Sequence, residues 1–323
     1  MGAPRLTFRR MWRGTRRRGI AVIRTLRPTS GGIPWTVIEQ RRLALRQRRT
    51  FGPADLEALG GLISGARRVM LLRDAAAVRP EMRAGALSVR HDTDHDLENS
   101  VLFAEWEASR GIRSTYFVLH TDWYWGDDPG RPSRFLVRAL RRIAALGHEI
   151  GLHNNAITAA LRLGGDPVEQ LERALKGLRR EGFEVVGTAA HGDDLCHIAG
   201  YDNSEVFVEC ADARLGAPDR VIRWEDDGAG RTAEATLQPV AMADLGLSYE
   251  AKYLGPLLYL SDTGGRWSVP FEPMAERLAQ GDTFLHVLTH PVWWAFEGEV
   301  VRPRATTRTV ADIGIGGRQP VHR

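Results

Sequence analysis

The sequence predicts an α/β fold in which parallel strands alternate with helices and gather polar residues at one end of a barrel. Two observations favour this fold. Strand-like apolar runs alternate with helical periodicities from residue 53 onward. Several of these strands end in aspartate or histidine, with Asp92, His153 and His191 at three of the ends. Because right-handed βα crossovers bring strand carboxyl ends to the same face, these side chains are expected to converge there.

The first elements follow a basic amino end. Pro53 opens a predicted helix whose apolar positions are Leu56, Leu59, Leu62 and Ile63. The apolar run VMLL at 69–72 comes next, and then the strand ALSVR at 86–90. A further helix is expected because four apolar residues share one face of a 3.6-residue period: Leu97, Val101, Ala104 and Ala108.

The middle of the chain repeats this alternation. The predicted strands are STYFVL at 114–119, HEIGL at 148–152 and VVGTAA at 185–190. A helix from about Ser133 to Gly147 separates the first two. A capping box of Asp166 and Glu169, with Pro167 at the first helical position, begins the helix before the third.

The alternation returns near the carboxyl end. LLYLSD at 257–262 ends in Asp262, and TFLHVLTH at 283–290 ends in His290, with a helix introduced by Pro273 between them. Residues 192–256 are irregular, so long loops or a small β excursion are expected there. The predicted organisation is a basic, loosely ordered arm over 1–50, a barrel over 51–300 containing that insertion, and a tail over 301–323.

Composition indicates a soluble globular enzyme. The chain has 323 residues, 43% of them apolar, which suffices for a sizeable core. The formal net charge of +4 is concentrated in two amino-terminal runs, FRRMWRGTRRR and QRRLALRQRR, so no nucleic-acid partner is expected. No stretch approaches the roughly 18 apolar residues of a membrane span, and Cys196 and Cys210 are too few for a disulfide scaffold. We therefore expect a cytoplasmic protein.

The stretch ALSVRHDTDHD at 86–96 is the strongest chemical signal. It ends in two histidines and three aspartates within six residues. Carboxylates this close repel one another unless a positive charge lies among them, and a histidine of ordinary pKa is mostly neutral at pH 7. A divalent metal would neutralise them, and a carboxylate that does not bind the metal could serve as a general base. The alternative is a solvated acidic loop that caps the next helix.

Residues 85–295 resemble the polysaccharide deacetylases of the NodB-homology superfamily. The resemblance rests on RHDTD, GIRSTYFVL, GHEIGLH at 147–153 and LTHP at 288–291. It implies a distorted parallel (β/α) barrel of about seven strands, similar to a TIM barrel. It also implies one divalent metal, usually zinc, and removal of acetyl groups from amino sugars. The chain is similar to a divergent branch with a His-Asp-x-Asp motif.

The resemblance implies roles for four residues. Asp92 is the general base, Asp94 and His153 bind the metal, and His290 is the general acid. Thr93 separates two aspartates that are adjacent in the common pattern, so the roles of base and ligand could be exchanged or could involve Asp96.

Other positions depart from the family pattern. Ile157 occupies the place of the usual second histidine, and isoleucine cannot bind metal. We expect His191, which also ends a strand, to be the third ligand instead. The arginine motif that orients the aspartate in many relatives is not evident. Asp262 either joins the site or begins the turn SDTGG.

Four histidines are interpreted as structural, with a minor chance of a site role for the last: His120, His148, His197 and His286. The aromatic residues beyond the strand ends either stack on sugars or cover the barrel mouth: Trp123, Tyr124, Trp125, Trp293 and Trp294. The predicted function is metal-dependent deacylation of a carbohydrate; the alternatives are hydrolysis of a small amide on the same scaffold and a non-catalytic carbohydrate-binding descendant.

Overall fold

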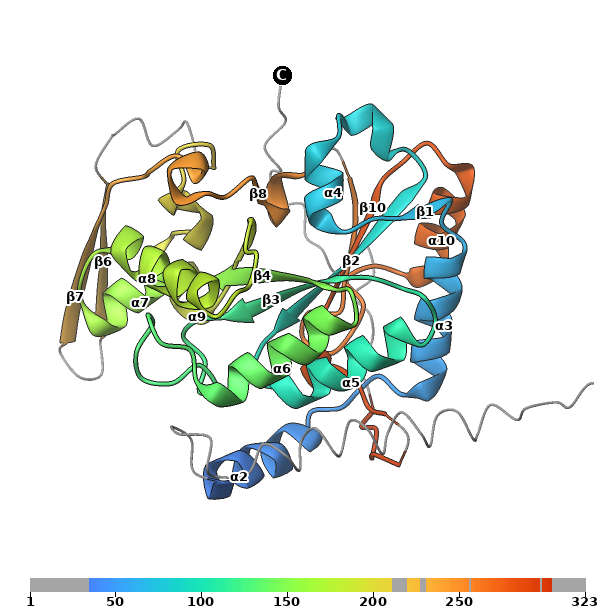
Figure 1. Cartoon of the computed structure of the whole chain (residues 1–323), viewed down its shortest axis with the longest axis horizontal. Helices are drawn as coiled ribbons and strands as arrows, with labels where there is room; N and C mark the ends of the chain where they lie inside the picture. Colours follow the sequence, from blue (N-terminus) through green and yellow to red (C-terminus); the bar gives the residue numbers. More distant parts are fainter. Residues whose placement is uncertain (1–34, 211–219, 227–230, 256, 297, 304–323) are drawn as a thin grey trace, which may run out of the picture.

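The protein is built on a curled, all-parallel sheet, seen in a computed structural model that describes residues 35–210, 220–226, 231–255, 257–296 and 298–303 (Figure 1). The strand order is β8-β5-β4-β3-β2-β10-β9, and β1 pairs with β2 beside this path. The bounds are β1 Arg68–Val69, β2 Ala86–Thr93, β3 Thr115–Leu119, β4 Glu149–Asn154, β5 Gly187–Ala190, β8 Tyr249–Glu250, β9 Leu258–Ser261 and β10 Leu285–Thr289. The prediction of an α/β fold of the distorted barrel type is confirmed.

Helices connect the strands and cover the outside of the sheet (Figure 1). The longer ones after residue 50 are α3 Pro53–Ser64, α5 Leu97–Ala108, α6 Arg134–Ala145, α7 Ala156–Leu163, α8 Pro167–Arg180 and α10 Phe271–Gln280. Their ends follow local capping chemistry. Ser133 Oγ accepts from the Leu136 amide at 3.1 Å, and Asp166 Oδ1 accepts from the Glu169 amide at 2.8 Å. The predicted starts of α6 and α8 are therefore confirmed.

Two stretches differ from the expected elements. In the run VMLL only Val69 is in a strand, and Leu72 begins the short helix α4, Leu72–Ala77. Helix α7 follows β4 almost directly, after Asn155, and this short helix was not among the predicted elements. Ile157 lies in α7, fully buried in the main core.

The irregular stretch 192–256 is an excursion that returns to the sheet. It contains the short helix α9, Asp194–Ala199, and an antiparallel pair of strands, β6 Arg220–Asp226 and β7 Arg231–Leu237. β7 packs against α7 and α8. The chain then returns through β8, which pairs with β5. The small β excursion expected from the sequence is present.

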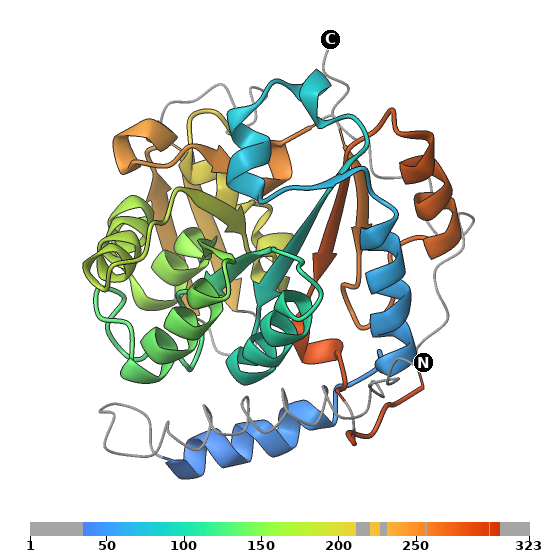
Figure 2. The same cartoon turned by 45° about the vertical axis from the view of Figure 1, so that its right-hand side comes forward.

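The amino-terminal segment is more ordered than a loose arm. Helix α2, Trp35–Arg46, lies beneath α5 and α6 in both views (Figures 1 and 2). Ile38 is 2% exposed and belongs to the main core. Arg42 forms an ion pair with Glu98 at the start of α5. The expectation of a loosely ordered arm is therefore wrong for residues 35–50, and residues 1–34 lie outside the described part of the chain.

The segment after α2 is joined to the segment after β10. The Thr50 amide donates to the Trp293 carbonyl at 2.8 Å, and the Ala295 amide donates to the Phe51 carbonyl at 2.7 Å. The Arg302 amide donates to the Arg49 carbonyl at 2.8 Å. Both ends of the barrel sequence thus meet beside the carboxyl end of β10. Of the expected tail, residues 304–323 lie outside the described part.

Two buried aromatic side chains explain two glycines of the sheet. Phe117 and Tyr249 pack against two glycines of the neighbouring strands, Gly151 and Gly187. A Cβ atom at either glycine would overlap one of these rings, so the sequence needs glycine there for packing. None of the helices in the described ranges is long and apolar enough to cross a membrane.

Candidate metal centre

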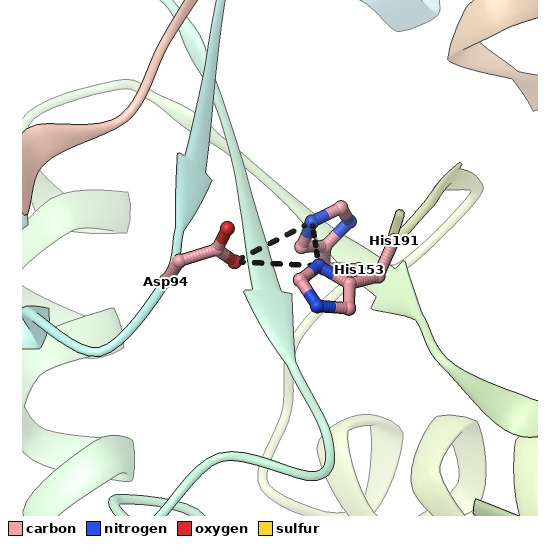
Figure 3. A group of neighbouring side chains, drawn as sticks. All are labelled: Asp94, His153 and His191. Carbon is pink, nitrogen blue, oxygen red and sulfur yellow. Dashed lines mark hydrogen bonds and ion pairs between the residues drawn. The ribbon is translucent and has the colours of Figure 1, made fainter. Parts of the chain in front are cut away.

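Three predicted ligands meet at the carboxyl ends of β2, β4 and β5. Asp94 follows β2, His153 lies in β4 and His191 follows β5 (Figure 3). Each residue offers one ligand atom, and these atoms all lie within 4.8 Å of one another. The distance from His153 Nε2 to Asp94 Oδ1 is 3.4 Å, and that from His191 Nδ1 to Asp94 Oδ1 is 3.8 Å. The structure thus brings together a group that can hold a metal ion.

The surroundings of His153 select the tautomer that a metal needs. His153 Nδ1 lies 2.7 Å from the Ala189 carbonyl, which only accepts, so Nδ1 carries the proton. Nε2 is then an unprotonated lone pair directed at Asp94. Burial lowers the pKa of His153, and the nearby carboxylates do not reverse this shift. Neutral imidazole with a backbone partner on its other nitrogen is the usual metal-binding form of histidine.

An unsatisfied acceptor at the centre fits a cation. Asp94 Oδ1 is buried and has no hydrogen-bond partner among the described residues. His191 Nδ1 lies 3.1 Å from His153 Nε2, so two imidazole nitrogens face each other beside that oxygen. Burial alone would raise the pKa of Asp94, but the histidines around it outweigh this effect and lower it. One carboxylate oxygen and two imidazole nitrogens form a donor set that suits zinc.

Asp92 lies beside the three ligands and is held by an arginine. Arg90 Nε and Nη2 each donate to a carboxylate oxygen of Asp92 at 2.7 Å. Asp92 Oδ2 is also 3.3 Å from His153 Nε2. Burial is the largest effect and would raise the pKa of Asp92, but Arg90, His153 and His290 together outweigh it and hold the pKa well below its ordinary value. Asp92 is therefore an ionised acceptor at the edge of the centre.

The orienting arginine was missed in the sequence analysis, although a signal for it exists. Residues i and i+2 of a strand point to the same face, so Arg90, Asp92 and the following Asp94 share a side. Arg90 precedes Asp92 by two positions, so this arginine lies in the same strand as the aspartate that it orients.

His290 faces the centre from the opposite side. Its Nε2 lies 3.9 Å from Asp94 Oδ2, and its Nδ1 lies 2.6 Å from Asp262 Oδ1. Trp294 Nε1 donates to the second oxygen of Asp262 at 2.6 Å. Burial is the largest effect and opposes the charged form of His290, but Asp262, together with Asp94 and Asp92, outweighs burial and raises the pKa of His290 to about 9. The two residues form an oriented pair.

Asp262 both begins a turn and contacts His290, so the two alternatives considered for it hold together. Its carbonyl accepts from the Gly265 amide at 2.9 Å, so it begins the turn. Its carboxylate is fully buried against His290 and Trp294.

Asp96 stays outside the centre and has a structural role. Its Oδ1 accepts from the Asn99 amide at 3.0 Å and so caps α5. Of the alternative, a solvated acidic loop that caps the next helix, only the cap is found: Asp96 caps α5, but it is buried. His148 is buried, with its Nδ1 accepting from the Ser114 amide at 3.0 Å, as expected for a structural histidine.

The aromatic residues at the rim divide into two groups. Tyr124, Trp125 and Trp294 are fully buried and belong to the core. Trp123 and Trp293 are partly exposed. Only the second group has ring surface that a ligand can reach.

No family model, curated protein or solved structure matches this chain. The site is therefore defined by its own geometry.

Proposed function

We propose that this protein is a metal-dependent hydrolase that removes an acyl group, an N-acetyl group above all, from a carbohydrate, in the manner of the polysaccharide deacetylases. One observation carries the proposal. The ligand atoms of Asp94, His153 and His191 converge, with an ionised carboxylate on one side and the pair of His290 and Asp262 on the other.

Asp94, His153 and His191 would hold the ion, for which zinc is the best fit. When bound, such a cation polarises an acyl oxygen and makes water more acidic. Asp92 accepts a proton from the attacking water, since it is ionised and lies beside the three ligands. Arg90 keeps Asp92 in one orientation through its two hydrogen bonds.

His290 donates a proton, whereas Asp92 accepts one. Asp262 binds Nδ1 and favours the imidazolium, so Nε2 carries a proton that it can donate to the departing nitrogen or oxygen. A base and an acid placed on either side of the ligands suit hydrolysis of an amide or ester.

Two variants test this assignment. Asp92→Asn should abolish deacetylation of acetylated amino sugars and leave the bound zinc nearly unchanged, because Asp92 lies outside the group of three. His153→Ala should lose the zinc as well as the activity. Asp127→Asn and His197→Ala, both at exposed positions, are the matched controls. Wild-type activity in Asp92→Asn, or full zinc content in His153→Ala, would contradict the proposal.

A mixed substrate screen and a metal analysis of the wild-type protein separate the alternatives. A hydrolase of small amides would bind zinc and cleave only the small substrates of a mixed screen. A non-catalytic carbohydrate-binding protein would purify without stoichiometric metal. The non-catalytic alternative rests on Ile157, which stands in place of a metal-binding histidine. His191 weakens this alternative because it supplies a third ligand atom. The cytoplasmic location remains a prediction.

A further inference from the structure

Arg49 connects the two loops that carry opposite sides of the metal centre. It follows α2, and its side chain is 4% exposed. Its Nη2 donates to Asp96 Oδ2 at 2.7 Å, and its Nη1 donates to the Val292 carbonyl at 2.6 Å. Asp96 comes two residues after the ligand Asp94, and Val292 comes two residues after His290. A single guanidinium thus joins the segments 94–96 and 290–292.

In each loop a backbone hydrogen bond links the segment that Arg49 binds to the site residue. The Asp96 amide donates to the Asp94 carbonyl at 2.7 Å, and the Trp293 amide donates to the His290 carbonyl at 3.0 Å. Asn99 Nδ2 makes a second connection by donating to the Trp294 carbonyl at 2.8 Å. These contacts hold together the two loops that carry Asp94 and His290. The distance from Asp94 Oδ2 to His290 Nε2 is 3.9 Å.

We propose that Arg49 is a positioning residue that sets the placement of Asp94 relative to His290. The inference rests on the proposed function, and it assigns a site role to a segment outside the barrel. A guanidinium suits this role because its planar fork donates in two fixed directions at once. A lysine ammonium at the same position cannot reproduce both hydrogen bonds with one geometry.

The test uses the full chain, Co²⁺ as the probe and two variants, Arg49→Lys and Asp96→Asn. The asparagine retains an oxygen for the α5 cap but removes the charge that Arg49 binds. Each variant should weaken Co²⁺ binding by about 10- to 100-fold, the usual effect of losing a residue that orients a ligand. The visible Co²⁺ spectrum should also change, and kcat should fall while KM stays constant.

Arg46→Lys is the control, since that side chain, at the last residue of α2, is 61% exposed. It should bind Co²⁺ as the wild type does. The double variant, Arg49→Lys with Asp96→Asn, should bind Co²⁺ no more weakly than the weaker-binding single variant, because both substitutions remove the same interaction.

The outcomes separate the two proposals. Folded variants that keep the wild-type Co²⁺ affinity and spectrum would overturn the role of Arg49 and leave the proposed function intact. A wild-type chain that binds no Co²⁺ would overturn both. If Arg49→Lys does not fold, Asp96→Asn decides the question alone.

Discussion

Arg90 and Asp92 form a buried, two-bond ion pair within one strand, and Asp92 Oδ2 lies 3.3 Å from Nε2 of the candidate metal ligand His153. Their side chains are 6% and 3% exposed. Breaking a buried pair leaves one charge without compensation, which costs far more than removing both charges together.

Arg90→Met should therefore lower the free energy of unfolding by about 3–5 kcal/mol. Denaturant titration would measure this, with the exposed Arg134→Met as the control. Adding Asp92→Asn should restore part of the loss, because no unpaired charge then remains. A loss equal to that of the control would contradict a tightly bound pair.

Zinc should stabilise the folded chain through His191. A ligand at 100 times its Kd raises the free energy of unfolding by about 2.7 kcal/mol, so treatment with EDTA should lower the Tm of the wild type. In His191→Ala the zinc-dependent shift in Tm should be much smaller, since one of the three ligand atoms is gone. His197→Ala should shift like the wild type. An unchanged shift in His191→Ala would remove His191 from the ligand set.

Glu250 should make stability fall with rising pH. Burial raises the pKa of Glu250 from 4.5 to about 7, despite the opposing charge of Arg90. The unfolded chain therefore loses this proton first, and the free energy of unfolding should decline between pH 4.5 and about 7, relative to Glu250→Gln. The decline should be roughly 3 kcal/mol in total.

Chemical denaturation at several pH values would measure this difference. The exposed Glu184→Gln should show no such trend against the wild type, because its side chain is 75% exposed. A flat difference between wild type and Glu250→Gln over this range would show that Glu250 titrates normally.

Gly187→Ala should destabilise the fold. The added methyl would overlap the ring of Tyr249, which is 2% exposed and has little room to move. Overpacking of this kind costs about 1–3 kcal/mol. Thermal unfolding would measure it against Gly61→Ala, where a Cβ meets nothing within 4 Å. Equal stability of the two variants would contradict the tight packing of Tyr249.

Local patterns in the sequence were enough to predict most of the sheet and its helices. Helix α5 spans Leu97–Ala108, the same residues that its apolar period indicated. The two-residue strand β8 could not be predicted, since it forms only by pairing with β5. Helix α2 was interpreted as part of a basic arm because its arginines dominate the pattern, yet Ile38 and Arg42 make tertiary contacts that composition does not reveal.

The candidate site was predictable where residues end strands. Asp94, His153 and His191 come together because parallel strands align their carboxyl ends. Arg49 was not predictable, because its partner Asp96 is 47 positions away and its second partner, Val292, is 243 positions away. No periodicity connects such positions.

The joining of residues 49–51 to residues 293–302 has a consequence for how the molecule is made. The ribosome makes residues 49–51 hundreds of peptide bonds before it makes residues 293–302. Contacts of such large sequence separation form slowly, because a long loop must close before they bring any gain. The nascent chain can therefore form much of its sheet before the site is complete. The site is completed only when the last part of the barrel, which carries Asp262 and His290, has been made.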